Sequence, residues 1–119
     1  MKKLLAALAA VTVAMAVLAS ASLATTPTLT GTVGPGYTIT LTQGGKKVTK
    51  LKHGTYKFVI NDKSPMHSFG LDGPKGFAKD FTTVPFKGTK TFTVALKVGK
   101  YKYYCKAHES TMFAHFTVA

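Results

Sequence analysis

The stretch that decides the fold covers residues 99–112 and reads Gly99-Lys100-Tyr101-Lys102-Tyr103-Tyr104-Cys105-Lys106-Ala107-His108-Glu109-Ser110-Thr111-Met112. In its first half Tyr101, Tyr103 and Cys105 alternate with lysines and Tyr104, which is the pattern of a half-buried β-strand. Its second half has the form Cys-x-x-His-x-x-x-Met, and we expect a short loop that re-enters a strand at Phe113. The stretch therefore predicts a strand with a cluster of chemically distinctive side chains at its end.

The same alternation recurs through the rest of the chain after residue 25, where aromatic or aliphatic residues alternate with threonine or lysine. The alternating sets are Tyr37, Ile39 and Leu41; Tyr56, Phe58 and Ile60; Phe92, Val94, Leu96 and Val98; and Phe116 and Val118. Glycine-containing turn signals separate them, and no window sustains a helical period. We predict one all-β domain, a Greek-key β-sandwich or barrel of about seven to eight strands.

The N-terminus reads as a secretory signal peptide. Lys2 and Lys3 precede an apolar run from Leu4 to Leu18, and mostly small residues follow it up to Ala24. Cleavage is expected after Ala24, with Ala21 as the other candidate, so residues 1–24 are the signal and residues 25–119 the working domain. That domain would act in the periplasm or outside the cell, without stable membrane insertion. The alternative is an uncleaved anchor, because residues 4–24 are just long enough to span a bilayer.

Charge and composition narrow the classes of partner and chemistry. All 16 basic residues are lysine and only four residues are acidic; residues 25–119 keep 14 lysines and a formal charge of +10. The lysines are spread along the chain, which indicates solvent-facing strand positions rather than a nucleic-acid groove and is compatible with an acidic protein partner. A single cysteine excludes disulfide stapling and zinc sites with several thiolates.

Four residues form a candidate metal-ligand set. Cys105, His108 and Met112 share one eight-residue window, and His67 lies 38 residues upstream of Cys105, where a strand gives way to a loop. Each residue alone is ordinary, since cysteine and methionine usually fill cores. Together, one thiolate, two imidazoles and a thioether are the donors of a blue copper electron-transfer site. Zinc rarely selects methionine, and iron–sulfur clusters need more thiolates than one.

At these residues the sequence resembles the cupredoxins, in particular the small plastocyanin- and azurin-like blue copper proteins. The marks of the resemblance are Gly54-Thr55-Tyr56-Lys57-Phe58, the His67-x-Phe69 element and residues 99–112. The resemblance implies a two-sheet Greek-key sandwich that binds one copper ion near one end, with His67, Cys105, His108 and Met112 as ligands. It also implies that electrons pass through the exposed edge of His108.

The sequence departs from that family pattern near the ligands. Ser68 stands where the family commonly has an asparagine whose side chain ties the two ligand loops together, and serine is shorter. Ala107 stands where a proline often precedes the second histidine. Its N–H can point towards the cysteine sulfur, and the competing outcome is that the loop, with three residues between His108 and Met112, holds this N–H away. Of the other histidines, we expect His115 to face outward on a strand, and His53 to lie at the opposite end of the sandwich.

The function expected from this set is one-electron transfer between Cu(II) and Cu(I) by a monomeric protein that is not an enzyme. A docking patch, defined as Pro65, Met66, Phe113 and Ala114, would meet transient redox partners around His108. Two other classes remain open. One is an extracytoplasmic copper carrier or sequestering protein with similar ligands. The other is a thiol enzyme built on Cys105 with a histidine base, for which only Glu109 is available as the orienting acid.

Overall fold

The structure of the protein, a computed structural model, describes residues 10, 12–14 and 25–119. Nearly all of the expected signal peptide lies outside the described residues, so the assignment of residues 1–24 stays a prediction. Within the described part, no helix has the length and apolar character needed to cross a membrane.

The described chain from residue 28 onward is built of β-strands joined by turns and two short 3-10 helices. The strands are β1 (Thr28–Val33), β2 (Ile39–Gln43), β3 (Lys46–Lys47), β4 (Lys50–Leu51), β5 (Gly54–Asp62), β6 (Phe69–Asp72), β7 (Ala78–Thr82), β8 (Gly88–Leu96), β9 (Gly99–Tyr104) and β10 (Phe113–Val118). The 3-10 helices are η1 (Pro74–Gly76) and η2 (Lys106–His108).

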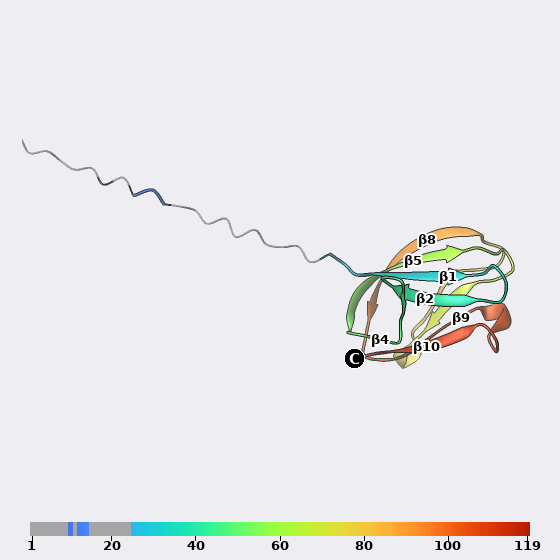
Figure 1. The fold of residues 1–119 in the computed structure, drawn as a ribbon. Coiled ribbons are helices and arrows are strands. Elements are labelled where there is room, and N and C mark those ends of the chain that lie inside the picture. The colour runs from blue at the N-terminus through green and yellow to red at the C-terminus, as the bar shows by residue number, and fades with distance from the viewer. Residues whose placement is uncertain (1–9, 11, 15–24) are drawn as a thin grey trace, which may run out of the picture.

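The strands form two five-stranded sheets, one in the order β3-β2-β1-β5-β8 and the other in the order β4-β10-β9-β6-β7. Figure 1 shows the two layers, with β8, β5, β1 and β2 in one and β9, β10 and β4 in the other. Pairing is antiparallel except between β1 and β5 and between β10 and β4. The predicted all-β sandwich is therefore confirmed.

The core lies between the sheets and is rich in aromatic rings. Alternate residues of β5 point into it, and Phe58 and Ile60 are fully buried. Phe58 stacks on Phe81 from the opposite sheet, with ring centroids 5.1 Å apart, and Phe69 stacks on Tyr103 at 5.8 Å. Each fully buried aromatic side chain contributes about 1.5–3 kcal/mol through its removal from water, so this core stabilises the sandwich whether or not a metal is present.

Ten strands are described where about seven to eight were expected, and β3 and β4 are only two residues long. The alternation pattern missed β1 because Gly31 occupies an inward position. A Cβ there would lie 2.6 Å from Ile60 Cδ1 and 2.8 Å from the Phe69 ring, so only glycine fits. It missed β6 because Phe69, Gly70 and Leu71 are buried in succession, which leaves no period of two.

Two of the expected strand residues are placed differently. Tyr37 precedes β2, which begins at Ile39, and is 66% exposed instead of facing the core. Val98 lies between β8 and β9 and is 62% exposed, because the turn ending at Gly99 lifts it out of the strand. The remaining members of the alternating sets are buried, apart from Ile39 and Phe92, which are partly buried against the core.

Candidate metal centre

Strand pairing brings the two segments with the predicted ligands to the same end of one sheet. β6 and β9 are antiparallel neighbours, and Gly70 of β6 pairs with Tyr104 of β9. His67 lies two residues before β6 begins, and Cys105 directly follows the last residue of β9. Because the start of β6 and the end of β9 meet, a separation of 38 residues in sequence becomes a direct contact between side chains.

His67, Cys105 and His108 form a compact cluster. The Nδ1 atoms of the two histidines each lie 3.8 Å from the Cys105 Sγ atom, and the three candidate ligand atoms all lie within 4.8 Å of one another. Cys105 is fully buried and His67 is 4% exposed, whereas His108 is half-buried. The cluster therefore lies below the surface, with one imidazole at the solvent side.

The separations fit a metal ion held between the three donors. A metal about 2.0 Å from a nitrogen and about 2.3 Å from a thiolate sulfur, with three donors spread evenly in a plane, requires an N···S separation of about 3.7 Å. The two observed N···S separations are 3.8 Å. Two imidazoles and one thiolate in this arrangement are the planar donors of type 1 copper sites.

Met112 closes the loop that follows Cys105. The Cys105 N–H donates to the Met112 carbonyl at 2.9 Å, and the Met112 N–H donates to the His108 carbonyl at 2.8 Å. The Met112 side chain is 1% exposed and belongs to the same buried core as Cys105. These bonds hold the fourth predicted ligand at the base of the loop, next in the chain to β10.

Ser68 links the two ligand loops. Its hydroxyl accepts a hydrogen bond from the Lys106 N–H at 3.1 Å and donates a long one to Cys105 Sγ at 3.9 Å. Its own N–H donates to the same sulfur at 3.4 Å. The shorter side chain therefore still spans from one loop to the other, because the β6–β9 pairing holds the backbones close together.

The sulfur receives these contacts from Ser68 rather than from Ala107. Between the described residues, no hydrogen bond joins the Ala107 N–H to Cys105 Sγ, so the second of the two outcomes left open by the sequence is the one observed. The reason is local geometry, since residues 106–108 form the 3-10 helix η2 and the His108 N–H donates to the Cys105 carbonyl at 3.0 Å.

The loop before His67 is ordered by its own side chains. The Asp62 carboxylate accepts a hydrogen bond from the Ser64 N–H at 3.1 Å, and the Ser64 hydroxyl accepts one from the Met66 N–H at 3.2 Å. The Ser64 carbonyl accepts a bond from the His67 N–H at 3.3 Å. These three hydrogen bonds fix the chain between Asp62 and His67 before it enters β6, and this fixes the point from which the imidazole extends.

Tyr37 is a residue of this centre that the sequence pattern did not reveal. Its ring centroid lies 5.0 Å from that of His108, in an edge-to-face arrangement, and 5.4 Å from that of His67. The alternation with Ile39 and Leu41 pointed to a strand position instead. The only local signal was the preceding Gly34-Pro35-Gly36 turn, which does not indicate what the turn faces.

The other two histidines lie where the sequence placed them. His115 is exposed on β10 opposite Lys102, while Phe116 next to it is buried. His53 stands just before β5 and contacts the carbonyl of Ala119, whereas the ligand loop follows the other end of that strand. Neither belongs to the cluster of possible metal ligands found in the described residues.

The charged and phenolic groups beside the cysteine are paired. Burial raises the pKa of Tyr104 to about 12, and its hydroxyl also donates to the Asp72 carboxylate at 3.1 Å. Burial likewise raises the pKa of Tyr103, although a backbone hydrogen bond with Leu41 opposes the rise. Lys102 Nζ lies 3.0 Å from Glu109 Oε1. Tyr103 and Tyr104, the two residues that precede Cys105, therefore remain neutral at physiological pH.

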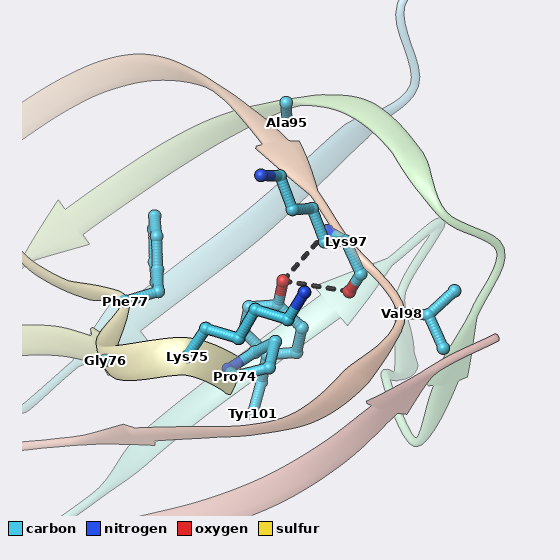
Figure 2. A pocket seen from close by; sticks show the side chains of 8 residues that line it. All are labelled: Pro74, Lys75, Gly76, Phe77, Ala95, Lys97, Val98 and Tyr101. Atoms are coloured by element: carbon cyan, nitrogen blue, oxygen red, sulfur yellow. Dashed lines mark hydrogen bonds between the residues drawn. The ribbon is translucent and has the colours of Figure 1, made fainter.

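A separate pocket of about 450 Å³ lies between η1 and the turn joining β8 to β9 (Figure 2). Tyr101 and Lys97 both line the pocket, and the Tyr101 hydroxyl binds the Lys97 backbone. It accepts a bond from the Lys97 N–H at 2.9 Å and donates one to the Lys97 carbonyl at 3.0 Å. None of the predicted metal ligands lines this pocket.

No protein-family model matches the sequence, and no curated protein matches it either. Solved structures do match the fold. Reduced rusticyanin superposes with a TM-score of 0.59 and 20% identity, over 82% of this chain and 81% of that one. An oxidised amicyanin variant superposes with a TM-score of 0.51 and 14% identity, over 78% and 83% of the two chains.

A third match is a multicopper oxidase from Pediococcus acidilactici, with a TM-score of 0.52 and 17% identity. It is matched over 79% of this chain but only 26% of the longer oxidase chain. At these identities the likeness concerns the fold. The described chain has the cupredoxin fold, as the resemblance in its sequence implied.

Proposed function

We propose that this protein is an exported type 1 copper protein that carries single electrons between redox partners. The observation that supports this most directly is the buried cluster in which both histidine Nδ1 atoms lie 3.8 Å from the Cys105 sulfur. Among the similar structures, rusticyanin is described as a copper protein, and one amicyanin variant is described with Cu(I).

In this proposal His67, Cys105, His108 and Met112 hold one copper ion. Copper bound to a thiolate, two imidazoles and a thioether supplies a reversible one-electron change between Cu(II) and Cu(I). The chain's own contribution is to keep the donors in one arrangement for both states. The Cys105–Met112 and Met112–His108 backbone bonds fix the second loop, and the hydroxyl of Ser68 ties it to the first.

We propose that electrons enter and leave at the half-buried edge of His108, because the other ligands are buried. Two residues of the docking patch that flank proposed ligands in the chain are exposed, Met66 by 64% and Phe113 by 44%. A formal charge of +10 on residues 25–119 would steer an acidic partner towards this protein. Such contacts are small and transient, which is compatible with a monomer.

Location outside the cytoplasm is part of the proposal and is supported by the sequence of residues 1–24. The positive start, the apolar run and the small residues at Ala21 and Ala24 have the form of a cleavable signal. Residues 25–119 would then be the exported copper-binding domain.

The two alternative functions fit the geometry less well. A copper carrier needs ligands that exchange metal readily, whereas Cys105, His67 and Met112 are each at most 4% exposed. A thiol enzyme needs an accessible sulfur and an acid that orients its base. Cys105 is fully buried, and Glu109 is paired with Lys102 at 3.0 Å.

The test is a visible absorption spectrum of the purified protein after titration with Cu(II), together with its copper content. We expect one copper per chain and an intense thiolate-to-copper charge-transfer band. A protein that takes up one Cu(II) and stays colourless would contradict the type 1 assignment. Rapid loss of bound copper to a chelator, with the band present, would instead favour the carrier.

A further inference from the structure

Three aromatic rings form one cluster at the solvent side of the metal centre. The ring centroids of His67 and His108 are 5.0 Å apart, and Tyr37 lies 5.4 Å from the first and 5.0 Å from the second. The Tyr37–His108 planes meet at 86°, so that one ring edge faces the other ring. Tyr37 is 66% exposed, so it covers the imidazoles from outside rather than filling the core.

The turn that carries Tyr37 is held in place against the His67 loop. The Gly34 N–H donates to the Thr38 carbonyl at 2.9 Å and closes the turn, in which Gly34 has a φ of +71°. A Cβ on Gly34 would lie 3.0 Å from Ser64 Cβ, which shows how closely the two segments pack. β1 also pairs in parallel with β5, and the Lys63 N–H donates to the Val33 carbonyl at 2.9 Å.

The ring of Tyr37 lies at the side of the site from which solvent would reach a bound metal. His108 is the half-buried member of the ligand cluster, whereas His67 and Cys105 are buried. Release of a metal held there would require the ligand on the solvent side to turn away, and the ring of Tyr37 lies against that imidazole. Edge-to-face packing also restricts the orientation of both rings when no metal is bound.

We infer that Tyr37 is a positioning residue of the metal centre, which holds the imidazoles of His67 and His108 in their binding orientation and slows the release of the metal. This inference rests on the proposed function, because it assigns the two histidines as ligands. The inference adds a reason for the site to retain its metal. Retention of the metal is what distinguishes an electron carrier from a copper carrier, which must transfer its metal.

The test compares Tyr37→Ala with Tyr37→Phe, which keeps the ring and loses only the hydroxyl. Val98→Ala is the matched control, because Val98 is also an exposed apolar residue, at 62%, but lies just before β9, at the end of that strand away from Cys105. Two quantities are measured. The first is the mobility of the two imidazole rings in the metal-free protein, by NMR relaxation. The second is the rate of Cu(I) release to excess bathocuproine disulfonate.

For Tyr37→Ala we expect more mobile imidazole rings and copper release faster by about tenfold, the size of one aromatic contact. For Tyr37→Phe and Val98→Ala we expect both quantities to stay within about twofold of the wild type. The inference would be overturned if the imidazole rings were as ordered in Tyr37→Ala as in the wild type, or if Val98→Ala had an equal effect. A wild-type protein that binds no copper refutes the proposed function instead, and the ring mobility still decides whether Tyr37 positions the histidines.

Discussion

Replacing Ser68 by alanine tests whether one hydroxyl both joins the ligand loops and tunes the sulfur. The Ser68 side chain is 5% exposed, and its hydroxyl accepts from the Lys106 N–H at 3.1 Å while it donates to Cys105 Sγ at 3.9 Å. Ser68→Ala removes both contacts and leaves the backbone bond from the Ser68 N–H to the sulfur in place. Alanine is smaller than serine by one atom, so packing changes little.

Two effects of different size are expected. Loss of the partner of the Lys106 N–H should lower the free energy of unfolding by about 1 kcal/mol, the usual worth of a neutral hydrogen bond. Hydrogen bonds to the sulfur withdraw electron density from the thiolate and favour Cu(I), so their loss should lower the reduction potential. A full bond worth about 1 kcal/mol corresponds to about 40 mV for one electron. At 3.9 Å the bond is long, so we expect a decrease on the order of 20 mV.

The assays are urea unfolding of the metal-free protein and redox titration of the copper-loaded protein. Ser64→Ala is the matched control, because the Ser64 hydroxyl in the same loop accepts a bond from the Met66 N–H at 3.2 Å but does not contact the sulfur. The control should lose stability by less than about 1 kcal/mol, since that bond is exposed, and should keep its potential.

The reasoning would be refuted if Ser68→Ala and Ser64→Ala changed the potential equally, since the change would then reflect loop order and not contact with the sulfur. A potential that rises in Ser68→Ala would also contradict it, because the sign follows from withdrawal of electron density. Unchanged stability in Ser68→Ala would show that water replaces the link between the loops.

Three other results are expected. Cys105→Ser should remove the charge-transfer band, because the thiolate supplies it, and far-UV circular dichroism should still report the folded sandwich, whose core is aromatic; a variant that stays blue would exclude Cys105 as the ligand. Stopped-flow electron transfer to an acidic partner should slow as ionic strength rises, because salt screens a formal charge of +10, and a flat or rising rate would exclude steering. Ala107→Pro should leave the potential unchanged at equal copper occupancy, because Ser68 supplies the hydrogen bonds to the sulfur; a clear decrease would restore Ala107 as a donor.

Sequence alone was informative where the signal is local. Cys105, His108 and Met112 lie in one eight-residue window, and the alternation of Tyr101, Tyr103 and Cys105 predicts on which side of β9 the sulfur lies. All three of these alternating residues are buried. Patterns of this kind need no knowledge of which strands are neighbours, because side-chain direction follows from the strand itself.

The contacts that the sequence did not predict depend on which strands are neighbours in a sheet. Tyr37 reaches the histidines because β1 and β5 pair in parallel, which sets the turn after β1 beside the loop after β5. Ser68 reaches Lys106 because β6 and β9 are adjacent, although β6 itself lacks an alternating pattern. Both contacts join segments that are far apart in the sequence and are brought together by strand pairing.

Register couples the stability of the fold to the geometry of the centre. A shift of one residue in the pairing of β9 would turn Tyr101, Tyr103 and Cys105 to the outer face together, because successive side chains alternate. Tyr103 stacks on Phe69 at the start of β6, two residues from His67, so the contact that buries the ring also aligns the two ligand loops. Aromatic burial therefore favours the register that presents the sulfur to the histidines, and this preference does not depend on a metal.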